Sequence, residues 1–229
     1  MLQYLVRKIL EWLKWQVSRP IQFDFDSAKH LDLGAGKDYH NPFGAAELYA
    51  ADLFSEKPLN FFGIEYFQVD LTGTLPFETN TFDSVSCFDV LEHIPRWERH
   101  VNGEVSFPFI NLMSEIYRIL KPGGFFYAHT PAYPSPAAFQ DPTHVNIISV
   151  DTINYFIEPN PYASTYGFLG GFKLVHQTWV RGVGPTTTRL PSPNFNSLDG
   201  LSDFLRFAIR SVRVFKNQNP SHLLWVLKK

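Results

Sequence analysis

Two segments of the chain combine the apolar pattern of a buried strand with residues suited to chemistry. In the first, His30-Leu-Asp-Leu-Gly-Ala-Gly36, the strand pattern runs into a Gly-x-Gly turn, and glycines let a ligand approach the backbone closely. The second, Leu75 to Pro95, contains the apolar run Phe82 to Phe88 and ends in Glu92-His-Ile-Pro95. Ligands bind along the carboxyl edge of open α/β sheets, so we expect these carboxylate and imidazole groups to lie near a ligand.

The residues that follow Gly36 argue against a nucleotide-phosphate site. A dinucleotide-binding turn requires a third glycine at position 39, to pack the helix against the strand and bring its amino terminus onto a pyrophosphate. Position 39 is Tyr, preceded by Lys37 and Asp38. No Gly-Lys-Ser/Thr follows the glycines, so a phosphate-binding P-loop is also absent. The turn therefore suits a ligand without phosphate groups.

The two segments, in this order, resemble the class I S-adenosylmethionine-dependent methyltransferases, in particular the bacterial type 11 and type 23 groups. The resemblance implies a Rossmann-like, doubly wound α/β fold. Its sheet would be seven-stranded and mostly parallel, with helices on both faces and an antiparallel last strand. S-adenosylmethionine is the cofactor that the resemblance implies, and S-adenosylhomocysteine is the product.

The resemblance assigns cofactor-binding roles to the first two strand ends. Backbone atoms of Gly34, Ala35 and Gly36 would contact the methionine portion of the cofactor. Asp32 would accept a hydrogen bond from its amino group, although this carboxylate is also placed to accept from amides of the loop. Asp52 would receive both ribose hydroxyls, because a carboxylate offers two oxygens to two neighbouring donors; capping a turn is the alternative.

Later strand ends supply the remaining cofactor contacts that the resemblance implies. Leu53 and Leu71 would wall the adenine, and Asp70 would accept from its exocyclic amine or, alternatively, cap a turn. Phe88 and Asp89 follow the strand of residues 82–88 and would flank the cofactor.

A hydroxyl acceptor must lose its proton as its oxygen attacks the methyl group, and an imidazole is the natural base. His93, His129 and His144 qualify by position, and His144 in Asp141-Pro-Thr-His-Val-Asn146 is our first choice. The alternative is a loop histidine that holds backbone, and His93 is more often structural in the family. A metal site built from Asp141, His144 and Asp151 is poorly supported, so we expect no metal.

The chain lacks the motifs of base methyltransferases, and this narrows the range of expected methyl acceptors. Base N-methylation favours an Asn-Pro-Pro-Tyr turn where this chain has Phe88-Asp-Val-Leu91, and pyrimidine C5-methylation requires a cysteine beside proline. The Leu-Pro-Phe, Leu-Glu-His-Ile-Pro and Asp-Pro-Thr-His segments resemble bacterial enzymes of surface-polysaccharide and glycolipid synthesis. We therefore predict O-methylation of a saccharide or other hydroxylated metabolite. A quinone, lipid or other small-molecule acceptor, and a non-catalytic methyltransferase-like binding protein, are the alternatives.

Composition sets broader limits on the protein. Its 229 residues, 45% hydrophobic and 16% aromatic, fit one folded domain with a substantial core. A formal net charge of −2 provides no basic field to attract nucleic acid, so a nucleic-acid partner is disfavoured. Cys87, the single cysteine, lies in an apolar strand pattern, which indicates a small core residue and is compatible with a reducing cytoplasm.

The elements that must position these residues follow from the apolar patterns. We predict strands at 30–33, 48–53, 67–71, 82–88, 125–129, 172–180 and 223–227, and a helix at 106–120. Asn41-Pro42 and Gly44 interrupt the segment after the glycine turn, so we expect a loop there instead of a full helix. The predicted single domain, 1–229, comprises an amphipathic helix (1–20), a cofactor-binding core (28–181), a loop-and-helix insert (182–217) and a final strand (221–229).

The expected cellular location of the protein follows from its apolar stretches and from the composition of residues 1–20. No stretch reaches the ~18 consecutive apolar residues of a membrane span, and no signal peptide is evident, so we expect a cytoplasmic protein. Residues 1–20 carry Arg7, Lys8, Lys14 and Arg19 together with two tryptophans, a composition that fits an interfacial helix at the inner membrane face. The alternative is a helix packed over the cofactor cleft. The pattern does not indicate an oligomeric state.

Overall fold

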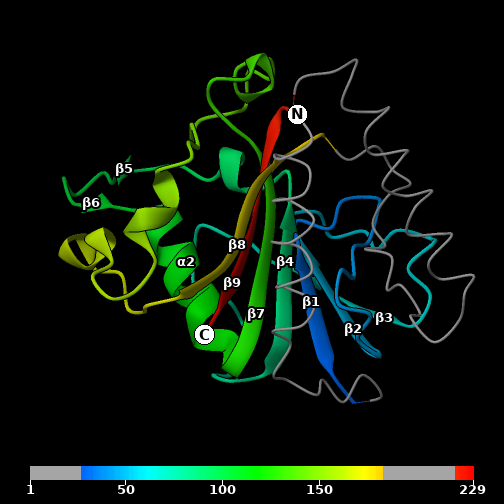
Figure 1. Ribbon diagram of the computed structural model, residues 1–229. Helices are drawn as coiled ribbons and strands as arrows, with labels where there is room; N and C mark the ends of the chain where they lie inside the picture. Colours follow the sequence, from blue (N-terminus) through cyan, green and yellow to red (C-terminus); the bar gives the residue numbers. More distant parts are fainter. Residues whose placement is uncertain (1–26, 183–219) are drawn as a thin grey trace, which may run out of the picture.

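A computed structural model describes residues 27–182 and 220–229 of the chain (Figure 1). The predicted helix at 1–20, and the predicted insert except for residue 182, lie outside the described residues. The strands of the main sheet are β1 (Lys29–Leu33), β2 (Glu47–Asp52), β3 (Ile64–Gln68), β4 (Phe82–Phe88), β7 (Leu120–Pro131), β8 (Lys173–Val180) and β9 (His222–Lys228). Shorter elements are η1 (Leu91–His93), β5 (Glu98–Arg99), β6 (Val105–Ser106), α2 (Pro108–Ile119), η2 (Pro136–Ala138), η3 (Thr152–Tyr155) and η4 (Tyr162–Tyr166).

The seven strands form one sheet in the order β3-β2-β1-β4-β7-β9-β8. Every pair from β3 to β7 is parallel, while β9 runs antiparallel to both β7 and β8. The predicted mostly parallel seven-stranded sheet with an antiparallel last strand is therefore confirmed. The strand order reverses between β1 and β4, and this is where open α/β sheets bind ligands, beyond the carboxyl ends of the strands.

Most strand positions agree with the apolar patterns, but the third strand does not. It was predicted at 67–71, whereas β3 covers Ile64–Gln68. Val69 still donates to the Asp52 carbonyl at 2.7 Å, after which the chain leaves the sheet and buries Leu71 in the main core. The apolar run at 67–71 thus marks packing beyond the strand end. The segment between β1 and β2 contains no helix, as predicted.

Helix α2 covers one face of the sheet (Figure 1). Pro108 occupies its first turn, where the missing N–H costs nothing. One stripe of α2 is buried against inward-facing residues of β1, β4, β7 and β9; it comprises Phe109, Ile110, Leu112, Met113, Ile116 and Ile119. Because α2 is the single α-helix among residues 27–182 and 220–229, the described part shows helical cover on this one face.

Charged and small side chains fix the ends of the central strands. Asp83 accepts from the Lys29 backbone N–H at 2.9 Å and pairs with the Lys121 ammonium at 2.7 Å, so it ties the starts of β1, β4 and β7 together.

Cys87 is fully buried in the core, as predicted. Gly123 adopts the left-handed conformation (φ 85°) expected of the Lys121-Pro-Gly-Gly124 turn, although the assigned β7 strand already begins at Leu120.

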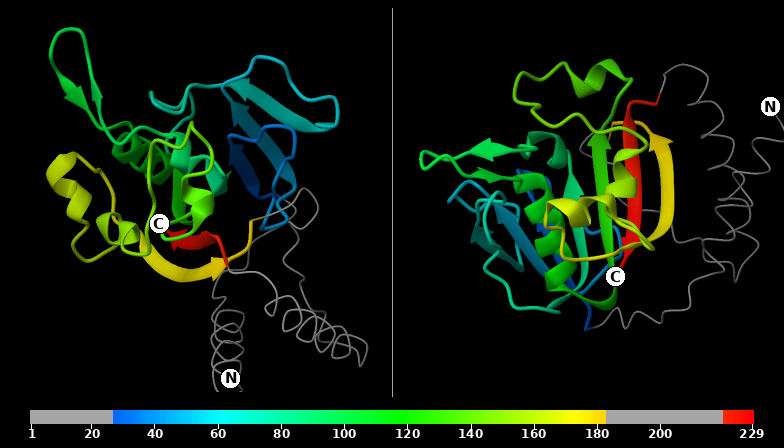
Figure 2. Two further views of the ribbon diagram at one scale, coloured as in Figure 1. Left: turned by 90° about the horizontal axis from the view of Figure 1, so that it is seen from above. Right: turned by 90° about the vertical axis from the view of Figure 1, so that its left-hand side faces the viewer.

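Two segments extend from the sheet. The β5–β6 hairpin projects away from the body of the protein, which is plain in both views of Figure 2. The segment between β7 and β8 contains η2, η3 and η4, and isolated bridges within it pair Ala132 with Ile148 and Ile157 with Phe172. Within the described ranges, no helix has the length and apolar character needed to cross a membrane.

Candidate active site

The Gly-x-Gly turn lies at the carboxyl end of β1 and is held from two sides. The backbone N–H groups of Gly34 and Ala35 both point at the Ala51 carbonyl, at 2.7 and 3.3 Å. A Cβ on Gly34 would lie 2.3 Å from a methyl carbon of Val90, so this glycine is required for close packing on the end of β4. Gly34 and Gly36 both adopt the left-handed backbone conformation, with φ of 69° and 52°. A Cβ added to Gly36 would meet nothing within 4 Å. The turn is thus packed at Gly34 and open at Gly36.

Asp52 reaches across this turn from the end of β2. Its Oδ2 accepts from the Gly36 backbone N–H at 2.8 Å, and its Oδ1 accepts from Phe54 N–H at 3.3 Å. A carboxylate has about four lone-pair sites, so both oxygens retain capacity for ligand donors. The structure therefore brings Asp52 beside the glycine turn.

Asp32 lies fully buried beneath the loop that follows this turn. It accepts from the Ser86 hydroxyl at 2.5 Å and from the His40 backbone N–H at 2.8 Å, and the His40 Nδ1 lies 3.2 Å away. Burial raises the pKa of the Asp32 carboxyl, and its contacts with His40 and Ser86 oppose that rise. These contacts show that Asp32 anchors the loop.

A buried histidine that the sequence analysis did not single out completes this network. His30 contacts the Ser84 hydroxyl at 2.7 Å, the Ser86 hydroxyl at 3.0 Å and the His40 carbonyl at 2.9 Å. Burial lowers the pKa of His30 to about 3. The detectable signal was the alternation of polar residues at 30, 32, 84 and 86, because alternate residues of a strand share one face. The face opposite α2 is therefore polar at the centre of the sheet.

Aromatic rings continue along the same face toward β7. His40 stacks on Phe88 with ring centroids 3.9 Å apart and an angle of 15° between the planes. Phe88 also stacks on Tyr127 and on His129, at 5.3 and 5.6 Å. Phe88, a predicted cofactor neighbour, is therefore placed in a row of rings at the end of β4.

The residues predicted to surround adenine lie beyond the ends of β2 and β3 with unequal exposure. Leu53 is exposed, whereas Leu71 is buried in the main core. The Asp70 carboxylate accepts from the backbone N–H and the hydroxyl of Thr72, at 2.9 and 2.7 Å. These bonds cap a turn, and contact of Asp70 with the cofactor stays a prediction.

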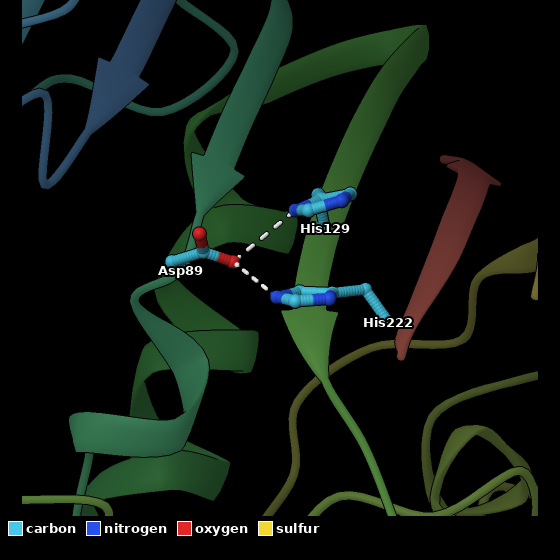
Figure 3. Close-up of side chains that lie close together, drawn as sticks. All are labelled: Asp89, His129 and His222. Carbon is cyan, nitrogen blue, oxygen red and sulfur yellow. Dashed lines mark hydrogen bonds and ion pairs between the residues drawn. The ribbon is translucent and has the colours of Figure 1, made fainter. Parts of the chain in front are cut away.

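Asp89 meets two histidines just beyond β4 (Figure 3). Its Oδ1 lies 3.1 Å from Nδ1 of His129 and 3.4 Å from Nε2 of His222. Burial alone would raise the pKa of Asp89, but the hydrogen bonds and charges of the two imidazoles outweigh it and lower that pKa. His129 was one of the three predicted candidates for a base; its other nitrogen, Nε2, lies 2.9 Å from the Arg181 carbonyl. His222 was missed because it lies 93 residues beyond His129 in the chain.

His144 lies beside Glu92, whose side chain is almost completely buried. The Glu92 Oε2 accepts from the Thr130 hydroxyl at 2.9 Å, while Oε1 has no hydrogen-bond partner within the described part of the chain. His144 Nε2 is 4.0 Å from that Oε1, and its Nδ1 lies 3.3 Å from the Ala138 carbonyl. Burial raises the pKa of Glu92 to about 8.

Backbone hydrogen bonds hold the loop that carries His144 against the segment after β4. The N–H groups of Val145 and Asn146 both donate to the Glu92 carbonyl at 2.9 Å. Asn146 also donates from its side chain to Leu91 O at 3.0 Å. The loop therefore rests on η1, and η1 follows the Val90 that packs against Gly34.

Two groups of three side chains in the described residues have metal-ligand atoms within 4.8 Å of one another. One is Asp89, His129 and His222, and the other is Glu92, His93 and His144. The set considered from the sequence, Asp141, His144 and Asp151, is not one of them.

Comparison with known proteins agrees with the fold of this sheet. A family model described as a methyltransferase domain matches residues 4–160, more than half of the chain. A search of curated proteins found no match.

Solved structures share the fold at low sequence identity. A S-adenosylmethionine-dependent methyltransferase from Archaeoglobus fulgidus is 16% identical, with a TM-score of 0.53 over 96% of this chain and 94% of the other. A putative methyltransferase from Bacillus halodurans is 17% identical, with a TM-score of 0.53 over 95% and 97%. A putative methyltransferase solved in complex with the Trm112 activator of Haloferax volcanii is 16% identical, with a TM-score of 0.51 over 95% and 88%.

The family match and the sheet topology together define a methyltransferase with a Rossmann-like α/β fold. The chain belongs to the methyltransferase-domain family, as the glycine turn and the Leu-Glu-His-Ile-Pro segment predicted. It is a class I S-adenosylmethionine-dependent methyltransferase, and S-adenosylmethionine is its cofactor.

Proposed function

We propose that this protein transfers the methyl group of S-adenosylmethionine to a hydroxyl of a saccharide or a related hydroxylated metabolite. The observation that carries the proposal is the loop of His144, which rests on η1 at the same sheet edge as the glycine turn. There His144 presents Nε2 toward Glu92 Oε1, while Nδ1 faces the Ala138 carbonyl. Donation from Nδ1 selects the tautomer whose Nε2 lone pair is free to accept a proton.

The cofactor-binding residues proposed for this chain are those at the ends of β1, β2, β3 and β4. The open space beside Gly36, next to the Asp52 carboxylate, fits a ligand that approaches the backbone and carries a pair of hydroxyls. Phe88 offers a ring face at the end of β4. The full proposed set is Asp32, Gly34, Ala35, Gly36, Asp52, Leu53, Asp70, Leu71, Phe88 and Asp89.

The proposed chemistry is a single displacement at the methyl carbon. The bound cofactor supplies an activated methyl group on a sulfonium. The acceptor oxygen attacks that carbon as the carbon–sulfur bond breaks, and the bonding pair leaves on sulfur to give S-adenosylhomocysteine. His144 Nε2 takes the hydroxyl proton, which contributes typically 10²–10⁴-fold to such reactions.

Calorimetry followed by an acceptor screen tests the proposal. The purified chain is titrated with S-adenosylmethionine and S-adenosylhomocysteine, and then incubated with sugar, glycolipid, quinone and lipid acceptors while S-adenosylhomocysteine release is followed. Turnover with hydroxylated sugars supports the proposal, and turnover confined to quinones or other lipids would replace the acceptor class. Cofactor binding without turnover on any acceptor would favour a non-catalytic binding protein.

The location and contacts of the protein are part of this proposal. We place it in the cytoplasm with a small-molecule or glycan acceptor and without a nucleic-acid partner, in line with its net charge of −2. Contact of residues 1–20 with the inner membrane face would bring the protein to the surface where a lipid-linked acceptor resides. Flotation of the full chain with anionic vesicles, compared with the chain lacking residues 1–20, tests this contact.

A further inference from the structure

The end of β4 carries a group of side chains that the methyl-transfer proposal does not fully use. Asp89, His129 and His222 come from three neighbouring strand ends, and their polar atoms converge on one point (Figure 3). We propose that these three side chains bind a divalent transition-metal ion of the Zn²⁺ class. Metal binding at this site does not depend on the identity of the methyl acceptor.

The separation of each imidazole nitrogen from Asp89 Oδ1 matches that of two donor atoms on a shared ion. Oδ1 of Asp89 lies 3.1 Å from Nδ1 of His129 and 3.4 Å from Nε2 of His222. Two metal bonds of about 2.1 Å that meet at about 90–110° place their donor atoms about 3.0–3.4 Å apart. One ion therefore fits between the carboxylate and either imidazole without a shift of the backbone.

The donor types select the class of ion. Two imidazoles and one carboxylate are a donor set used for catalytic zinc and for non-haem iron. Mg²⁺ and Ca²⁺ prefer shells made of oxygen atoms alone. The site thus favours Zn²⁺, Fe²⁺ or Co²⁺ over the alkaline-earth ions.

The far side of each imidazole already has a hydrogen-bond partner. His129 Nε2 faces the Arg181 carbonyl at 2.9 Å, and His222 Nδ1 faces the Ser221 hydroxyl at 2.7 Å. Metal-binding histidines usually engage their other ring nitrogen in this way, which fixes the tautomer and the ring orientation. Each ring therefore presents its remaining nitrogen to Asp89.

Coordination requires one ring to turn. The two imidazoles are stacked, with centroids 4.6 Å apart and an angle of 14° between their planes, so their lone pairs run side by side. His222 is the ring placed to move, because its side chain is 11% exposed and His129 is 2% exposed. The ring also lies against Gly182, where a Cβ would come within 2.8 Å of it.

An ion from solvent can reach the site past the Asp89 carboxylate, and on that side it would keep coordination positions that these three side chains leave open. Its side chain is 47% exposed, so solvent reaches the carboxylate while both imidazoles remain covered. Three protein ligands leave at least one position of a four-coordinate ion for water or a substrate oxygen. An ion there would link the ends of β4, β7 and β9.

Metal titration of tag-free protein tests the site. After removal of metal with EDTA, the full chain is titrated with Zn²⁺ by calorimetry and with Co²⁺ by visible absorption. We expect one ion per chain, and a loss of affinity of at least about tenfold in Asp89→Asn and in His222→Gln. His93 belongs to the other group of three, so His93→Gln is the matched control and should bind Zn²⁺ with the affinity of the wild type.

Three results would overturn the proposal. They are the absence of stoichiometric binding, equal affinity in wild type and Asp89→Asn, or a loss confined to His93→Gln, which would place the ion beside Glu92. Circular dichroism of each variant without metal verifies its fold. As an independent readout, Zn²⁺ should raise the Tm of the wild type but not of Asp89→Asn or His222→Gln. His129 is left unchanged because it is buried within the row of rings.

Discussion

The buried carboxyl of Glu92 makes the stability of the protein depend on pH in a defined direction. Burial raises the pKa of Glu92 from 4.5 to about 8, so the folded protein keeps a proton that the unfolded chain releases near pH 4.5. The contribution to stability is fully present below about pH 4.5 and is lost as the pH rises through about 8. Glu92→Gln removes the titration while preserving the size of the side chain and an oxygen that accepts from Thr130.

The size of the effect follows from the shift. The difference of about 3–4 pH units, at about 1.4 kcal/mol per unit, gives an upper limit of about 5 kcal/mol. Relaxation around the ionised carboxylate reduces this limit, and we expect about 2–3 kcal/mol. Relative to the wild type, Glu92→Gln should therefore gain that amount of unfolding free energy between pH 5 and pH 8.5.

Urea denaturation followed by circular dichroism at half-unit pH steps measures the difference. Comparing variant with wild type cancels the contributions of Asp32 and His30, whose pKa values burial also shifts. Glu47→Gln is the control, because Glu47 forms an exposed ion pair with Lys29 and should leave the pH slope unchanged. Equal pH slopes in wild type and Glu92→Gln would refute the argument that Glu92 is buried in its neutral form.

Four further variants test the glycine turn and the proposed base. Asp52→Ala should weaken S-adenosylmethionine binding by about 1–3 kcal/mol through lost charge-assisted hydrogen bonds; unchanged calorimetric affinity would show that Asp52 is misassigned. His144→Ala should reduce turnover while sparing cofactor affinity, and near-normal turnover would remove His144 as the base. Gly34→Ala should destabilise the fold by about 1–3 kcal/mol, since its Cβ would collide with Val90 at 2.3 Å. Gly36→Ala, which meets nothing within 4 Å, should cost less stability in urea denaturation and chiefly impair cofactor binding; equal stability losses would contradict this distinction.

The central strands were predictable because their signals are local. The predicted strand, Phe82 to Phe88, matches β4 residue for residue, and within it the core residues Val85 and Cys87 alternate with Ser84 and Ser86. The third strand was misplaced because Val69 and Leu71 are apolar for a different reason: they fill the core after the chain has left the sheet. An apolar run alone does not distinguish a strand from the packed segment that follows it.

Parts of the candidate site were visible in the sequence, and others were not. The glycine turn and Asp52 were assigned from motifs, and the structure brings them within hydrogen-bond distance of each other. His30 and the serines of β4 were overlooked, because their importance comes from facing one another across the sheet. His222 lies beyond an interval that carries no motif, and only pairing of β9 with β7 brings it to His129.

The sequence by itself determined three things: the family, the succession of strands and turns that builds a mostly parallel sheet, and the positions at which glycine is needed. These depend on residue types a few positions apart, where backbone geometry is nearly fixed. The tertiary structure decided which ionisable groups share a site and which protonation states they favour. Glu92 and Asp32 are ordinary acids in the sequence, and their raised pKa values arise from loss of contact with water. Burial and long-range pairing are properties of the whole fold, so no local pattern records them.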